Sequence, residues 1–413
     1  MNSSRLSILA TVDLAGICRG RAMPGEIAAS VGWVPANLGI TTFAALADNP
    51  FGSLGDLRIC ADPATTVPLP TRDGHVTLTL GDLRNGDGTD WDCCPRALLR
   101  RSLDELQAHT GLTIRAAFEH EFVLQPDEPA GHPFSVQRLV SAEPFGTHLI
   151  GALAQAGLEP ETWLPEFGHG QWEVTLRPAS GLAAADRAIL LREIVRASAA
   201  AAGRTATFAP TPPGRGATSG AHIHFSLWTG DGKPATHGDR EHGLSETAAH
   251  FAAGILEHAP ALLAITAPSV VSYQRLGPGH WSADSPRLAV RDREALLRIP
   301  GPASATDDQA AQTHFEYRAA DSTANPWLAL GAIVRAGLDG VARHLADPEH
   351  ARPAAVFPRS LEEALAALDH DQVMSEWMPA DMKRTYLSVK NSEATGMREL
   401  SDDEVHARYA RAY

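Results

Sequence analysis

The sequence predicts an α+β fold in which a small strand-rich unit precedes a larger unit of helices packed on a curved, open sheet. Three observations carry this prediction. Short segments between turns fill the chain up to about residue 90, long helical patterns begin at Pro95, and several later strands have one polar face. We therefore expect one domain at residues 1–92 and a second domain at residues 93–413.

The first 90 residues alternate between turn-forming stretches and short strands. Glycine, proline, asparagine and aspartate gather in segments such as DNPFGSLGD and RNGDGTD, which are typical of turns. Between them, alternation such as HVTLTL indicates strands, because successive side chains of a strand point to opposite faces. This composition predicts a domain built mainly of strands.

Longer helices follow from Pro95. That residue opens a helix that Gly111 closes, since proline is tolerated in the first turn of a helix and glycine just beyond the last. Further helices are predicted at 184–202, across SETAAHFAAGILEHAPALLAI, after Asn325-Pro326 and from Asp402 onward. Their alternation with polar-faced strands favours an open sheet backed by helices.

Four short segments place ionisable side chains on alternate residues. Side chains two apart on a strand share a face, and the residues between them here are largely apolar. One face of the sheet is therefore expected to pack on the core while the other carries glutamate, histidine and arginine. The segments are Glu119-His120-Glu121, Gln171-Trp172-Glu173, His222-Ile223-His224-Phe225-Ser226 and Glu316-Tyr317-Arg318.

Carboxylates with one histidine are the ligand set of hard divalent cations such as Mg²⁺ or Mn²⁺. The candidates are enough for two or three ions: Glu119, Glu121, Glu166, Glu173, His222 and Glu316. Arginines, which bind carboxylate and phosphate oxygens in pairs of hydrogen bonds, accompany them: Arg275, Arg287, Arg291, Arg293, Arg298 and Arg318. Cations beside arginines are expected where a nucleoside triphosphate meets an acidic co-substrate. Each motif alone is more often a solvated surface or a turn, and their joint occurrence favours the site.

Several other classes of protein are disfavoured. The chain has no GxxxxGK[ST] loop, no GxGxxG after a strand and no GxSxG elbow, which argues against P-loop, Rossmann and α/β-hydrolase sites. A net charge of -14 over 413 residues argues against nucleic acid or an anionic membrane as a partner. We also expect no signal peptide, no membrane span and reduced thiols at all four cysteines, and therefore a cytoplasmic location.

The order of these motifs resembles the glutamine synthetase superfamily over nearly the whole chain. The matching segments are FEHEFVL, EFGHGQWEV, SGAHIHFSLW, YQRLGPG, RDREALLRIP and EYRAADSTANPWL. The resemblance implies an N-terminal β-grasp domain and a catalytic domain with a curved antiparallel sheet backed by helices. It also implies homo-oligomeric rings, stacked as a dodecamer, in which two subunits share each active site.

The resemblance further implies a reaction and a role for each residue. ATP phosphorylates the γ-carboxylate of glutamate, and an amine then attacks the acyl phosphate. The implied sets are Glu121, Glu166 and Glu173 for one ion; Glu119, His222 and Glu316 for another; Gly220, Arg275 and Arg318 for glutamate; Arg293 and Arg298 for the transferred phosphate, with Arg293 and Arg318 catalytic; and Glu161, His224, Ser226 and Arg298 for the nucleotide.

Departures from the family pattern point to the amine. Ammonia-using members carry a glutamate in the flap that follows R-L-x-P-G, where this chain has Trp281, and an ammonium-binding aspartate before G-S, where this chain has Asn49-Pro50-Phe51. An indole offers an apolar wall or a cation-π surface to an organic amine. The change resembles the branch that makes γ-glutamyl amides from polyamines, alkylamines or anilines, and we count Trp281 among the catalytic residues.

Alternatives remain open at this stage. Trp281 is otherwise a packing residue that orders the flap, and the enzyme is otherwise a glutamine synthetase that uses ammonia, or a catalytically silent relative. The low density of acids in the expected pocket favours a monoamine over a polycation. Two further departures, Ala217-Thr218 in place of Asn-Gly and His314 in place of an arginine, weaken the expected glutamate and phosphate contacts. The segment that carries the adenylylated tyrosine in relatives is missing, so we expect no such control.

Overall fold

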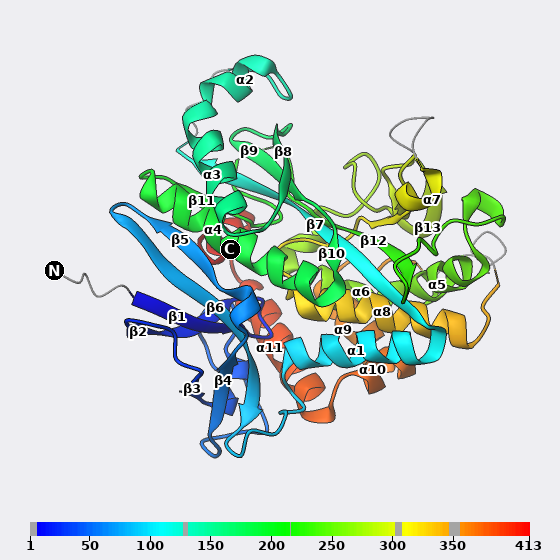
Figure 1. Cartoon of the computed structure of the whole chain (residues 1–413), viewed down its shortest axis with the longest axis horizontal. Coiled ribbons are helices and arrows are strands. Elements are labelled where there is room, and N and C mark those ends of the chain that lie inside the picture. The colour runs from blue at the N-terminus through cyan, green and yellow to red at the C-terminus, as the bar shows by residue number, and fades with distance from the viewer. Residues whose placement is uncertain (1–5, 127–130, 215, 302–307, 347–355) are drawn as a thin grey trace.

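The N-terminal part of the molecule is a sheet of short strands. The computed structural model describes residues 6–126, 131–214, 216–301, 308–346 and 356–413. Within them, a six-stranded sheet has the order β2-β1-β6-β4-β3, with β5 also paired to β6. The pair β1–β6 is parallel and the other pairs are antiparallel. The strands, blue in Figure 1, are β1 (Leu6–Val12), β2 (Cys18–Pro24), β3 (Ser30–Trp33), β4 (Leu57–Ala61), β5 (Val67–Thr71) and β6 (Gly74–Asn85).

A second sheet of nine described strands forms the rest of the scaffold. Its order is β13-β14-β15-β12-β7-β9-β8, and β10 and β11 pair with β7. All its pairs are antiparallel except β13–β14. The strands are β7 (Leu112–Gln125), β8 (Pro160–Pro165), β9 (Gln171–Leu176), β10 (Ala179–Ser180), β11 (Thr205–Thr207), β12 (Ala221–Thr229), β13 (Ser285–Val290), β14 (Ala295–Ile299) and β15 (Phe315–Tyr317).

The long strand β7 shows how the sequence pattern divides this sheet into two faces. Phe118, His120 and Phe122 are buried, and Phe118 and Phe122 belong to the main core. Glu119 and Glu121 alternate with them and point to the opposite face. His120 lies on the core side, where its Nδ1 is 2.9 Å from Ser322 Oγ and burial holds its pKa well below the usual range. It is thus a neutral core histidine.

Helices cover the core face of the second sheet. Helices α1 and α4 pack on β7, and α8 packs on α1, α4 and α5 (Figure 1). The helices are α1 (Pro95–Thr110), α2 (Val136–Ser141), α3 (Glu143–Gln155), α4 (Gly181–Ala201), α5 (Glu246–Glu257), α6 (Ala259–Thr266), α7 (Gln309–Gln312), α8 (Pro326–Ala342), α9 (Leu361–His370), α10 (Gln372–Trp377), α11 (Ala380–Met397) and α12 (Asp402–Ala412). The predicted fold class, α+β with a strand-built N-terminal domain and a helix-backed curved sheet, is confirmed. The domain division that we propose, at residue 92, falls between β6 and α1.

One predicted helix is two helices in the structure. The sequence indicates a single helix across SETAAHFAAGILEHAPALLAI, but α5 and α6 meet at an angle of 75°. Pro260 lies in the first turn of α6, where its ring and missing N–H prevent the helix from continuing. At the junction, buried His258 contacts Asp371 through Nδ1 at 2.6 Å and Asp339 through Nε2 at 3.0 Å. These contacts fix the bend.

A buried cluster around Arg96 joins the two parts of the molecule. Arg96, in the first turn of α1, bonds Asp62 beyond β4 at 2.6 Å and Asp82 of β6 at 3.1 Å. It also bonds Asp186 of α4 through Nε and Nη2, at 3.0 and 2.8 Å. The indole of Trp327 donates to the same Asp186 carboxylate at 2.8 Å. The N-terminal sheet is therefore fixed to the helices by a compensated set of charges.

Among the described residues, no single helix is both long and apolar enough to span a membrane. The bent pair of α5 and α6 reaches that length and composition only when its two helices are taken together.

Candidate active site

Strand register brings the predicted site residues together. In the pairing of β7 with β12, Glu119 lies opposite His222, and in the pairing of β7 with β9, Glu121 lies opposite Glu173. Glu316 of β15 lies opposite both His224 of β12 and Arg298 of β14. Side chains directly opposite on neighbouring strands share a face and touch. One face of the sheet therefore gathers carboxylates, histidines and arginines.

The tightest group of these side chains contains Glu119, His222 and Glu316. His222 Nδ1 lies 2.7 Å from Glu119 Oε1 and 3.7 Å from Glu316 Oε1. One ligand atom from each residue lies within 4.8 Å of the others. Among the described residues, these three form the group of acidic and histidine side chains that lie close enough together to hold a metal ion. Two carboxylates and an imidazole at this spacing suit a divalent cation.

The second predicted set, Glu121, Glu166 and Glu173, lines the same cavity. Glu121 accepts hydrogen bonds from Gln171 Nε2 at 2.9 Å and from the backbone N–H of Gly220 at 3.1 Å. Glu166 accepts one from the N–H of Phe167 at 3.1 Å. Glu121 and Glu166 are thus held in place by hydrogen bonds from their neighbours.

Burial and, after it, the neighbouring carboxylates raise the pKa values of two of these glutamates. Burial and four neighbouring carboxylates raise the pKa of Glu173 to about 10. Burial and the charge of Glu166 raise the pKa of Glu121 to about 7. The residues fit the divalent cations that glutamine synthetases use, since a cation placed here would relieve this repulsion.

Histidines and arginines act in the opposite direction on the other two carboxylates. Burial alone would raise the pKa of Glu316, but the charges of His224, His222 and Arg318 lower it to about 2. Burial would also raise the pKa of Glu119. Hydrogen bonds with His222 and His224 outweigh burial and hold this pKa well below its usual range. Burial and the charge of Arg318 lower the pKa of His222 to about 4, so its imidazole is neutral and able to ligate a metal.

Among the described residues, four arginines line the cavity, and three of them contact Glu316 or His222 directly. Arg298 Nη1 donates to Glu316 Oε2 at 2.7 Å, and Arg318 Nη1 donates to Glu316 Oε1. Arg275 is buried, donates to the carbonyls of Ala319 and Arg318, and lies 3.3 Å from His222 Nε2. Arg293 lines the cavity with an exposed side chain. This arrangement offers fixed positive charge to anionic groups.

Gly220 is required by close packing behind the site. A Cβ at this position would lie 2.7 Å from Arg275 Nη2 and 2.8 Å from His222 Nε2. Any side chain would therefore displace the arginine and the histidine together.

The flap that carries Trp281 is anchored through its backbone. The N–H of Gly279 donates to Glu294 Oε1 at 2.6 Å, and Arg318 Nη2 donates to the carbonyl of Trp281 at 2.8 Å. Trp281 has φ 52°, a left-handed conformation that costs about 1 kcal/mol for a residue with a Cβ. Its indole is 66% exposed and lines the cavity. The backbone thus holds the ring over the site.

The main cavity has a volume of about 880 Å³, and most predicted site residues line it. Three do not. Glu161 is exposed on β8 and pairs with Arg177 at 3.6 Å, while Ser226 accepts a hydrogen bond from Trp228 Nε1 at 2.8 Å. Gly220 lies behind the lining. Nucleotide binding by Glu161 and Ser226 stays a prediction.

Some lining residues were missed by the sequence reasoning. They include Phe134, Phe167, Gln171, His280 and His406. Gln171 shares the alternating pattern with Glu173, which could have identified it. Phe167 directly follows the predicted ligand Glu166, whereas Phe134 and His406, on α12, come close to the site only through the tertiary fold. His314, noted above as a departure, contacts His224 with Nε2 3.1 Å from Nδ1.

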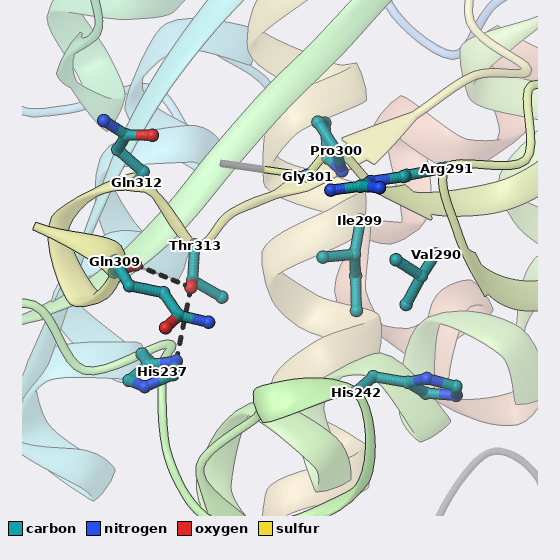
Figure 2. Close-up of a pocket in the computed structure, with 10 residues that line it drawn as sticks. All are labelled: His237, His242, Val290, Arg291, Ile299, Pro300, Gly301, Gln309, Gln312 and Thr313. Atoms are coloured by element: carbon teal, nitrogen blue, oxygen red, sulfur yellow. Dashed lines mark hydrogen bonds between the residues drawn. The ribbon is translucent and has the colours of Figure 1, made fainter. Parts of the chain in front are cut away.

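A second, smaller cavity of about 190 Å³ lies at the ends of β13 and β14, around Val290 and Ile299. Figure 2 shows Thr313 at its wall, where Oγ1 donates to the carbonyl of Gln309 and lies 3.3 Å from His237 Nδ1. Of the predicted metal ligands and the residues implied for glutamate or nucleotide, all within the described chain, none lines this cavity, whereas Arg291, one of the candidate arginines, does. It is separate from the carboxylate site.

Comparison with known proteins agrees with this geometry. The glutamine synthetase catalytic domain matches residues 92–409, and the glutamine synthetase N-terminal domain matches residues 1–91. A gamma-glutamylpolyamine synthetase, GlnA3 of Streptomyces coelicolor, is 33% identical over 98% of this chain and 93% of its own. A glutamine synthetase of Pyrococcus furiosus is 32% identical over 93% of this chain and 89% of its own.

A solved structure agrees as well. The crystal structure of a novel glutamine synthase homolog is 41% identical, with a TM-score of 0.93, and the match covers 100% of this chain and 99% of the other. The fold and site define an ATP-dependent ligase that forms carbon–nitrogen bonds. The chain belongs to the glutamine synthetase family.

Proposed function

We propose that this enzyme joins the γ-carboxylate of glutamate to an organic amine with ATP as co-substrate. The observation that carries the proposal is Trp281, whose exposed indole lines the cavity at the flap position where ammonia-using relatives carry a glutamate. An ammonium pocket needs acids, because a small cation is otherwise bound no better than by water. An indole instead favours an amine with a carbon substituent.

The reaction proceeds in two balanced steps. A γ-carboxylate oxygen of glutamate attacks the γ-phosphorus of ATP, the bond to ADP breaks, and γ-glutamyl phosphate forms. The nitrogen lone pair of the amine then attacks the acyl carbon, the bond to phosphate breaks, and inorganic phosphate leaves while nitrogen loses a proton. Mg²⁺ or Mn²⁺, two or three per site, would neutralise phosphate charge when bound to the two carboxylate sets.

The arginines supply the remaining charge stabilisation in this proposal. Arg275 and Arg318 hold the carboxylates of glutamate, with Gly220 leaving room behind them. Arg293 and Arg298 face the transferred phosphoryl group, where donors fixed in advance stabilise charge that develops in the transition state. His224, together with Glu161 and Ser226, is proposed to contact the nucleotide. We propose assembly into stacked rings in which neighbouring subunits share sites.

Synthesis of glutamine from ammonia is the second candidate, favoured by the likeness to the glutamine synthetase of Pyrococcus furiosus. Phosphate release from ATP and glutamate, measured with ammonium and a panel of organic amines, separates the two. Organic amines should give the higher kcat/KM. Turnover with ammonium alone would refute the organic-amine proposal, and no turnover with any acceptor would favour a catalytically silent relative.

Substitution of the flap residue tests the same point more sharply. Trp281→Glu restores an acid beside the attacking nitrogen, so kcat/KM for ammonium relative to an organic amine should rise, by about tenfold. Trp281→Phe is the matched control, because it keeps an aromatic wall without adding charge. If the ratio is the same in the wild type and in Trp281→Glu, residue 281 does not set the choice of amine.

A further inference from the structure

Three aromatic side chains that belong to different segments line the same cavity. Phe134, Phe167 and Trp281 are 46%, 64% and 66% exposed, although large apolar rings are normally covered. Leu164 and Pro212 extend the apolar part of the lining. An apolar patch of this kind beside a charged centre marks a binding surface for a group that is itself apolar.

The rings are fixed to the catalytic framework. Phe167 directly follows Glu166, one of the proposed metal ligands, and its N–H donates to that carboxylate at 3.1 Å. The N–H of Phe134 donates to the carbonyl of Pro165 at 3.2 Å. The backbones of Phe167 and Phe134 are therefore hydrogen-bonded to Glu166 and to its neighbour Pro165, at the edge of the site.

Arg138 reinforces this arrangement from α2. It is buried, and its guanidinium donates to the carbonyl of Glu166 at 2.9 Å and to the carbonyl of Gly168 at 2.9 Å. The two bonded carbonyls flank Phe167. The segment that presents the ring is therefore held on both sides rather than left as a loose loop.

The charges of the cavity disfavour a second positive group on the amine. Among the described lining residues, every carboxylate is in the proposed metal set: Glu119, Glu121, Glu166, Glu173 and Glu316. Four arginines line the same cavity. The described residues of this chain thus offer no further acid to the distal ammonium of a diamine or polyamine, and its desolvation there is not offset by an ion pair with them.

On the basis of the function proposed above, we infer that the amine is a primary monoamine with an aryl or bulky alkyl group. Phe134 and Phe167, with Trp281, receive that group, while the nitrogen attacks the acyl carbon of γ-glutamyl phosphate. The carbon–nitrogen bond forms, the bond to phosphate breaks, and nitrogen releases one proton as phosphate leaves. The phenylalanines are specificity-determining residues and take no part in the bond changes.

The test compares benzylamine, methylamine, 1,4-diaminobutane and ammonium as acceptors, with phosphate release as the readout. Benzylamine should exceed 1,4-diaminobutane in kcat/KM by about tenfold or more, since burial of an apolar group discriminates by that factor. If the diamine is preferred while organic amines still turn over, the inference fails and the proposed function stands. If ammonium alone turns over, or no acceptor does, both fail.

Variants separate the role of the rings from a general role. Phe134→Ala and Phe167→Ala should each raise KM for benzylamine about tenfold and change kcat/KM for methylamine and ammonium by much less. Val136→Ala is the matched control, because Val136 is 73% exposed on the neighbouring helix and does not line the cavity. Equal losses for all acceptors in the phenylalanine variants, at unchanged melting temperature, would overturn the inference.

Discussion

Two clusters of buried charge in this molecule differ in how their charges are compensated. The cluster around Arg96 pairs opposite charges, whereas the cluster around Glu173 brings like charges together. Around Arg96, three aspartates surround one guanidinium that donates to all of them within 3.1 Å. Around Glu173, carboxylates crowd together, and burial and four like charges raise its pKa to about 10. Charges are buried without great cost only when they are paired.

The difference separates structure from function. The Arg96 cluster is complete within the protein and fixes the N-terminal sheet to the helices. The carboxylate cluster is incomplete without cations, and its unrelieved repulsion lowers stability in their absence. Strongly perturbed pKa values in a cavity are more frequent at functional sites than in structural networks. The comparison therefore supports the carboxylate face as the reaction centre.

The largest expected effect comes from the incomplete cluster. Glu173→Gln removes a proposed metal ligand, so kcat for phosphate release should fall by about a thousandfold, the loss of several kcal/mol of charge stabilisation. The free energy of unfolding without metal should stay the same or rise, because an amide is buried without charge and without having to take up a proton. A variant that retained full activity with Mg²⁺ or Mn²⁺ would refute the assignment of this ligand.

Substitution in the Arg96 cluster should lower the stability of the protein and leave its activity unchanged. Arg96→Met leaves three aspartates without their shared partner, so the free energy of unfolding should fall by about 3 kcal/mol while kcat of the folded enzyme is kept. Arg100→Met is the matched control, since Arg100 is partly exposed and bonds only to Asp82 among these aspartates. Its loss should be below about 1 kcal/mol. Denaturant unfolding measures both, and equal losses would contradict the comparison.

The smallest expected effect is the pH dependence of stability and of Mn²⁺ affinity. Between pH 4.5 and about 10, Glu173 keeps a proton in the folded protein but not in the unfolded chain, so stability without metal falls as pH rises. Metal binding must displace that proton, and affinity for Mn²⁺ should therefore increase with pH, by up to about tenfold per unit for each proton released. Calorimetry in buffers of different ionisation enthalpy counts the protons. Binding without proton release at pH 7 would show that Glu173 is not a ligand.

Much of the scaffold could be predicted because its signals are local. Alternation along β7 and β12, the proline that opens α1 and the glycine that closes it are all read within a few residues. The register that places His222 opposite Glu119 joins positions 103 residues apart, and no local pattern contains it. The break between α5 and α6 differs from the predicted single helix, because the apolar pattern continues on both sides of Pro260.

The parts that escaped prediction are products of tertiary packing. The partners of Arg96 lie 14, 34 and 90 residues away, and an arginine in a first helical turn carries no sign of them. Phe134 and Phe167 are likewise ordinary apolar residues in the sequence. Only the fold decides that their rings stay exposed and line the cavity. Chemistry-bearing residues could be predicted by type, whereas the residues that shape the acceptor pocket could not.

The anchoring of Trp281 through its carbonyl has a consequence for how such enzymes diversify. Arg318 holds the peptide of residue 281, and that contact is available whatever side chain the residue carries. The side chain of residue 281 can therefore change while its backbone keeps the same hydrogen bond. In the function proposed above, a substitution at residue 281 can therefore change the amine that is accepted while the peptide bonded to Arg318 keeps its place.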